Sequence, residues 1–307
     1  MSSTTSAVGK RRLRTPTWDA KFDDVAPLRS IVEAVQNVVS RVTFKITRQD
    51  SESPYFLKID TADVAYVSCI SVRYQLDKVN NNSGDDEIKF CVDCKHIAPC
   101  LANIRQEHTL TLEGHEDQAS PKIVIRTCDP DHPSHETTTE LDTFVDSDNV
   151  QLFPMDHDIM LEIDLLMFRG LLKQAQVAKA DQIVIRIFIK ETAGQTVSFT
   201  HFSVQGEFKH SSSFCHEVSK DEDGSMIVRA ATDSMHNLFD TDDIEPVYEG
   251  IFPVEKVSGF MKPLQCRMLV AKVKQNMPIM FSHCIGGSTD DVSHIRFLIA
   301  PVNPETD

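Results

Sequence analysis

Two kinds of hydrophobic pattern alternate along the chain, and their order repeats once. Apolar residues recur at intervals of three and four over 27–40, 164–180 and Val254–Leu264, which is typical of amphipathic helices. A further helix is predicted over Cys94–Gln106, although Pro99 leaves its first turn open. Between these helices the sequence predicts strands at Val42–Thr47, Tyr55–Ile59, Val64–Arg73, Thr109–Leu112 and Ile123–Thr127, and again at Gln182–Ile189, Thr196–Val204, Ser213–Val218, Arg267–Val273, Pro278–Ser282 and Ile295–Ile299.

Each half therefore reads helix, strands, helix, strands, which predicts a duplicated α+β domain of ordinary domain size. Breaks in composition divide the chain further. We expect a disordered basic N-terminal extension at 1–23, a first domain at 24–135, a connector at 136–158, a second domain at 159–302 and a C-terminal tail at 303–307.

The composition is that of a water-soluble globular protein. Of the 307 residues, 41% are hydrophobic and 25% are charged, and no apolar run is long enough to span a bilayer. The eight cysteines are spread along the chain rather than arranged as a compact disulfide framework. An intracellular, reducing location is the expectation.

The distribution of charge changes the picture that the total charge gives. A formal net charge of −15 argues against nucleic-acid binding, because phosphate contact needs Lys and Arg. Yet the four predicted helices, counted over 27–40, 94–106, 164–180 and 254–267, together carry nine basic and three acidic residues. In the third helix Arg169, Lys173 and Gln176 form a polar stripe opposite the apolar one. A basic helical surface on an acidic body is typical of proteins that follow a nucleic-acid backbone, and solvated helix faces remain the alternative.

Five short stretches, in order from about Val25 to the end, resemble the proliferating cell nuclear antigen (PCNA) family of DNA sliding clamps. The last of them, Ser293–Val302, carries a strand almost to the end of the chain and stops it at Ala300-Pro301. The other four stretches are Leu28–Val35, Ile59–Val67, Gln205–Phe208 and Asn276–Ile279.

This resemblance implies the DNA clamp fold, in which two duplicated domains each place helices on one face of antiparallel sheets. It further implies a ring of three identical chains around duplex DNA, closed where an edge strand near Thr137–Val145 pairs with one near Phe208–His216 of the next chain. DNA polymerases, repair proteins and a clamp loader would be partners, in the nucleus or another site of DNA replication. The cations expected to contact DNA without reading its sequence are Arg29, Lys95, Arg105, Arg169, Lys173, Lys179 and Lys262.

The resemblance also implies a surface pocket that captures short peptides of partner proteins. Such a pocket has an apolar floor and leaves backbone free to pair with the peptide. Leu298 stands where the family usually has an aromatic residue, and Lys190 falls where eukaryotic clamps carry a modified lysine. The matching pocket positions are Ile59, Val64, Tyr66, Leu152, Phe153, Pro278, Leu298, Ala300 and Pro301.

Other functions compete with this interpretation. A subunit of the related heterotrimeric checkpoint clamp has the same fold with different partners. Cys91, Cys94, His96 and Cys100 suggest a zinc site, but four ligands within ten residues that run into a helix favour packed thiols, so no metal and no cofactor are expected. A plain interaction scaffold also stays open. The sequence has no Gly-rich phosphate loop, nucleophile elbow or His-Glu-x-x-His motif, and nothing in it supports an enzyme. The basic cluster Lys10–Arg14 reads equally as a solvated tail or a nuclear-import signal.

Overall fold

The computed structural model describes residues 15–65, 67–105, 107–115, 121–132, 134, 136–145, 150, 156–192, 195–220, 226–230, 244–285 and 293–302. For 191, 192, 195, 197, 214–217, 220, 229 and 230, only the backbone is described. Within this part of the chain no helix is long and apolar enough to cross a membrane.

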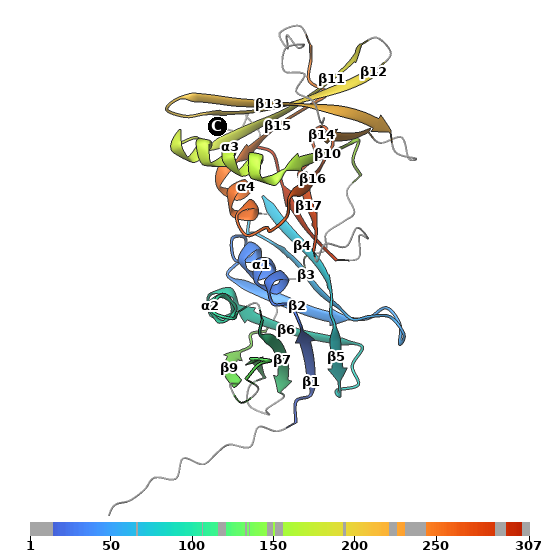
Figure 1. The fold of residues 1–307 in the computed structure, drawn as a ribbon, viewed down its shortest axis with the longest axis vertical. Coiled ribbons are helices and arrows are strands. Elements are labelled where there is room, and N and C mark those ends of the chain that lie inside the picture. Colours follow the sequence, from blue (N-terminus) through green and yellow to red (C-terminus); the bar gives the residue numbers. More distant parts are fainter. Residues whose placement is uncertain are drawn as a thin grey trace, which may run out of the picture.

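The four helices of the described residues lie along one side of an elongated molecule (Figure 1). Helix α1 packs beside α2, α3 packs beside α4, and α1 packs beside α4, so the helices form one row in the order α3, α4, α1, α2. Leu28, Ile31 and Val35 of α1 are fully buried, as the helical periodicity predicts. The bounds are Ala26–Val35 for α1, Cys94–Ala102 for α2, Leu165–Val177 for α3 and Val254–Met261 for α4.

The strands follow the same duplicated order as the helices. The first half contains β1 (Trp18–Phe22), β2 (Arg41–Thr47), β3 (Phe56–Ala62), β4 (Ser68–Gln75), β5 (Lys78–Asn81), β6 (Glu87–Asp93), β7 (Thr109–His115), β8 (Lys122–Cys128) and β9 (Glu136–Asp142). The second contains β10 (Ile159–Asp164), β11 (Gln182–Thr192), β12 (Gln195–Gln205), β13 (Lys209–Lys220), β14 (Met226–Ala230), β15 (Tyr248–Pro253), β16 (Met268–Val273), β17 (Ile279–Cys284) and β18 (His294–Ile299).

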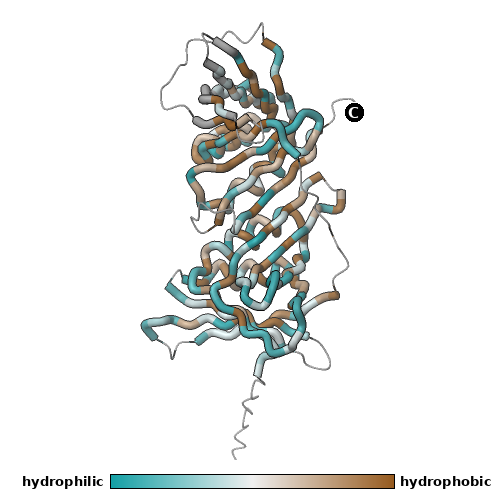
Figure 2. The backbone as a smooth tube through the Cα atoms, turned by 90° about the vertical axis from the view of Figure 1, so that its right-hand side faces the viewer, coloured by the Kyte–Doolittle hydropathy of each residue, from teal (hydrophilic) through white to brown (hydrophobic). Residues whose placement is uncertain are grey.

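Two sheets lie on the other side of the helix row. The smaller has the order β5-β1-β7-β8-β9, and the larger has the order β15-β11-β12-β13-β14-β10-β16-β17-β18-β4-β3-β2-β6. The larger sheet crosses from one half to the other through the antiparallel pair of β18 and β4, which runs from His294 opposite Arg73 to Ile299 opposite Ser68. Figure 2 views the molecule from the sheet side, where hydrophilic and hydrophobic residues alternate along the strands.

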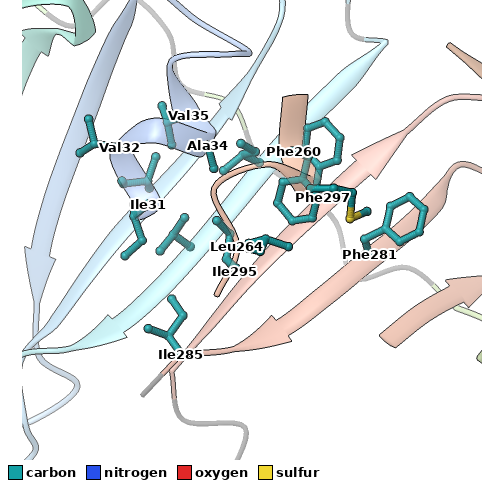
Figure 3. Packing of buried hydrophobic residues seen from close by; sticks show 14 of the residues in the cluster. Ile31, Val32, Ala34, Val35, Phe260, Leu264, Phe281, Ile285, Ile295 and Phe297 are labelled. Carbon is teal, nitrogen blue, oxygen red and sulfur yellow. The ribbon is translucent and has the colours of Figure 1, made fainter. Parts of the chain in front are cut away.

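The core lies between the helix row and the sheets. Figure 3 shows its centre, where Ile31 and Val35 of α1 meet Phe260 of α4 and the inward residues of β17 and β18. The rings of Phe260 and Phe297 are stacked with centroids 4.3 Å apart. This core is continuous between the halves. The two halves are therefore held together both by burial of apolar area and by the β4–β18 hydrogen bonds.

Several boundaries differ from the sequence prediction. Residues 18–22, expected within a disordered extension, form β1, whose alternate residues Trp18, Ala20 and Phe22 are buried between β5 and β7. The strand β9 pairs with β8 and so belongs to the first domain rather than to a connector beginning at 136. The sequence prediction missed β5, β6, β10, β14 and β15. Each half opens with a strand, β1 or β10, rather than with the predicted helix. The prediction of two helices in each half, and of a strand near 137 at a sheet edge, is confirmed.

Candidate functional site

Two arginines of the predicted DNA surface instead cap neighbouring helices. Arg169 on α3 donates from Nε to Met261 O (3.0 Å) and from Nη2 to Met261 O (2.7 Å) and Lys262 O (3.0 Å), and it also donates to Leu264 O. These carbonyl oxygens lie at and beyond the C-terminus of α4, where helical partners run out. The Arg169 guanidinium therefore stabilises the C-terminal end of α4.

Arg29 makes the equivalent contact in the first half. Its Nε donates to Leu101 O at 3.1 Å and its Nη2 to Ile104 O, at and just after the end of α2. The first helix of each half therefore holds the second through an arginine. Arg29 and Arg169, both expected to contact DNA, therefore have guanidinium donors engaged by backbone carbonyl oxygens of the same chain.

Lys179 is also engaged within the chain. It follows α3 with φ +51°, in the left-handed region, and its N–H donates to Gln176 O while the next N–H, of Ala180, donates to Ala175 O. This is a Schellman ending, normally filled by glycine. The ammonium group of Lys179 pairs with Glu207 at 2.5 Å, on the loop between β12 and β13. That loop lies close to the helix end, because a Cβ on Gly206 would stand 2.0 Å from Ala178 O.

The other predicted cations are exposed on the helix row. Lys95, Arg105, Lys173 and Lys262 are exposed, and none forms an ion pair with another described residue. Lys95 stands on α2, Arg105 just after α2, Lys173 on α3 and Lys262 at the C-cap of α4. The helix row thus presents separated positive charges on the side facing away from the sheets.

The predicted partner pocket is only partly assembled by described residues. Pro278 precedes β17, and Leu298 lies on β18 opposite Met280 and Cys69. Leu298 is half-buried on the sheet face opposite Phe297 and Ile299, which point into the core. Tyr66, Leu152 and Phe153 fall outside the described residues.

The end of β18 is held against the loop between β3 and β4. Ala300 N donates to Val67 O at 2.8 Å, and Val302 N donates to Ile251 O at 2.7 Å. Val64 in that loop is fully exposed, and Ala300 and Pro301 are half-buried. The structure therefore brings Val64, Ala300 and Pro301 to one end of the β4–β18 junction.

Ile59 is not part of this surface. It is fully buried and pairs with Val72, so its side chain lies on the helix-covered face of the sheet. Since the residues on the other face of β3 are its neighbours Lys58 and Asp60, the alternation of the strand excludes Ile59 from an outer pocket.

The cysteine group does not form a cluster. Within the described residues no three potential ligands gather at one point. Burial raises the pKa of Cys94 to about 12, with a contribution from nearby Asp93, and the Cys100 thiol donates to His96 O at 3.1 Å along the helix. These are the environments of packed thiols, which are poor metal ligands when protonated. The absence of zinc stays a prediction.

Comparison with known proteins identifies the fold of this chain. No family model matches the chain, and no curated protein matches its sequence. Among solved structures, the chain is similar to the crystal structure of proliferating cellular nuclear antigen from Entamoeba histolytica, with a TM-score of 0.68 over 94% of this chain and 100% of that chain at 12% identity. The chain has a PCNA-like clamp fold. At this identity the likeness concerns the fold, and the clamp's helix row and sheet layer are the framework in which the sites above are placed.

Proposed function

We propose that this protein is a DNA sliding clamp, a ring of three copies that encircles duplex DNA and tethers polymerases and repair proteins. The observation that carries the proposal is a pair of free strand edges. The internal duplication makes α1-β2-β3-β4 equivalent to α3-β11-β12-β13, and α2-β7-β8-β9 equivalent to α4-β16-β17-β18. Within the chain, β4 pairs with β18. Their equivalents, β13 and β9, have no such partner among the described strands.

The two free edges match in length. All seven residues of β9 lie at the edge of the smaller sheet. In β13, pairing with β14 begins only at His216, so that residues 209–215 have no second strand partner among the described residues. Pairing β9 of one copy with β13 of the next would repeat the internal junction head to tail. A repeated heterologous junction of this kind either closes into a ring or continues as a filament, and the clamp fold favours the ring.

The helix row would line the hole of this ring. Lys95, Arg105, Lys173 and Lys262 from each copy would contact phosphates, which positions a protein on DNA without reading the sequence. In a chain of net charge −15 such contacts are few, so affinity would be weak and salt-dependent, and closure of the ring would supply retention.

The sheets would face outward and hold partners. The surface around Leu298, Ala300 and Pro301 would take an apolar peptide segment, with no chemistry performed by the clamp itself. We place this activity in the nucleus or another site of intracellular DNA replication. Lys190, an exposed residue on β11, is a candidate for modification.

Molar mass in solution tests the ring. Light scattering of the purified chain is expected to give about three times its mass of 34.5 kDa. A monomer that trimerises only with two other proteins would instead identify a heterotrimeric checkpoint clamp subunit. Thr137→Pro and Thr138→Pro sharpen the test, because neighbouring residues of β9 direct their N–H groups to opposite sides. One substitution should break the β8 ladder and lower the melting temperature. The other should leave the fold intact and abolish assembly.

A further inference from the structure

Four cations stand in a line across the outer face of the large sheet. Lys89 on β6 lies opposite Lys45 on β2, Lys45 lies opposite Lys58 on β3, and Lys58 lies opposite Arg73 on β4. With neighbouring strands about 4.8 Å apart, this cationic row spans about 14 Å. It lies far from the helix row that would face DNA, and it is unexpected in an acidic chain.

The alternation of the strands fixes the face. Phe44 and Ile46, on either side of Lys45, are fully buried toward the helices, so Lys45 points to the opposite face. The same argument holds for each member of the row. Other charged or titratable groups on this face near the row are acidic Asp60 and Glu87, and His294 and Arg296 of β18.

Three charges of the row, those of Lys45, Lys58 and Arg73, are not compensated by an ion pair with any described residue. Like charges directly opposite each other destabilise a sheet. Lys45 and Lys58 form no ion pair with any described residue. The guanidinium carbon of Arg73 lies 4.1 Å from the centroid of the Phe56 ring, and its buried Nε has no hydrogen-bond partner in the described structure. The row therefore offers donors and positive charge to an anion.

We propose that the cationic row binds an acidic, extended segment of a partner peptide whose apolar anchor sits at Leu298. This inference rests on the proposed function, because the anchor site is the proposed partner pocket. Leu298 and the row share the outer face: Leu298 lies opposite Cys69, and Arg73 is four residues further along the same strand. That separation is about 13 Å, which about four extended residues span.

The surroundings of the row favour a peptide over single-stranded nucleic acid. Proteins that bind single strands stack bases on aromatic rings. Among the described residues, the rings of Phe56 and Phe144 lie beside the row, and each is covered by a guanidinium group, Phe56 by Arg73 and Phe144 by Arg41 at 4.2 Å. Carboxylates need no such platform, and Lys side chains reach them with flexible stems.

Fluorescent peptides test the proposal on the full-length protein. Each carries one aliphatic and two aromatic anchor residues, with a flank of four Glu or a flank of four Ser on either side. The Glu-flanked peptide should bind about tenfold more tightly at about 50 mM salt, and this advantage should vanish at about 1 M, where the Debye length is about 3 Å. Lys45→Gln/Lys58→Gln should remove the advantage and leave the Ser-flanked affinity unchanged. Lys78 is an exposed lysine on β5 of the other sheet, so Lys78→Gln is the matched control. This variant should keep the tighter binding of the Glu-flanked peptide.

The outcomes separate this inference from the proposed pocket. Equal affinity of the two flanks, or an advantage that survives in Lys45→Gln/Lys58→Gln, overturns it. If no anchored peptide binds, a ten-residue Glu-rich peptide without an anchor is tested next. If this peptide binds the wild type but not Lys45→Gln/Lys58→Gln, the cationic row is supported and the pocket is rejected. If it does not bind the wild type, both are rejected. Oligothymidylate tests the nucleic-acid alternative. If it binds the wild type more tightly than the acidic peptides do, and binds the double variant less tightly, the row binds nucleic acid and the proposal is overturned.

Discussion

Lys256 on α4 forms an ion pair with Asp63, 3.1 Å from Nζ to Oδ2, and this contact joins the second half of the chain to the loop between β3 and β4. Asp63 also accepts from Val67 N and Ser68 Oγ, each at 2.8 Å. Burial alone would raise the pKa of Asp63, but hydrogen bonds from Ser68, Lys256 and Val67 outweigh it and lower the pKa below its ordinary 3.8. The carboxylate thus organises the loop at one end of the proposed pocket.

Asp63→Asn should lower the free energy of unfolding by about 1–2 kcal/mol at neutral pH. Because the folded pKa of Asp63 is depressed, its contribution is complete well above pH 3.8 and is lost as pH falls below 3.8 toward the folded pKa. Urea unfolding from pH 7 to pH 2 should show the difference between variant and wild type shrinking in acid. A difference that stays constant across this range would contradict the account.

Arg169→Ala and Lys173→Ala should separate helix capping from DNA contact, although both residues lie on α3. Arg169→Ala leaves three carbonyl oxygens at and beyond the end of α4 without their donor and should cost about 2 kcal/mol of stability. The second replaces an exposed, unpaired lysine and should change stability by less than about 0.5 kcal/mol. Lys173→Ala should instead remove about one phosphate contact per chain, which lowers the slope of log affinity for circular DNA against log salt concentration. Equal effects of the two substitutions on melting and on retention would refute the assignment.

Lys179→Gly should stabilise the protein by about 0.5–1 kcal/mol, because glycine adopts the left-handed conformation found there without a Cβ penalty. The lost ion pair with Glu207 is exposed and contributes little. Lys173→Gly is the matched control: it places glycine inside the same helix and should destabilise by about 1 kcal/mol. Thermal melting of the two variants should therefore move in opposite directions. A loss of stability in Lys179→Gly would contradict the helix-ending argument.

The helices and many of the strands were predictable because local periodicity reports which side of an element is buried. The missed β6 shows the limit: Cys91 is buried on the outer side, beneath the bridge to Phe144, so that its alternation breaks before α2 begins. The site was predictable only by residue type. Charge counting indicated a basic helix row, yet no local pattern shows that Arg29 and Arg169 donate to carbonyl oxygens 72 to 95 positions away in sequence. The cationic row was missed for the same reason, because its members come together only through strand register.

Leu298→Asp should abolish capture of a partner peptide while leaving the ring intact. Leu298 is half-buried on the outer face opposite Met280 and Cys69, and a carboxylate there would meet the apolar anchor of the peptide. Truncating such an anchor contact typically costs about 2 kcal/mol, or about thirtyfold in affinity. Gln75→Glu adds the same charge at the exposed far end of β4 and should bind the Ser-flanked peptide normally. Calorimetry measures the affinities, and light scattering checks the assembly. Normal peptide affinity in a folded Leu298→Asp ring would place the partner pocket elsewhere.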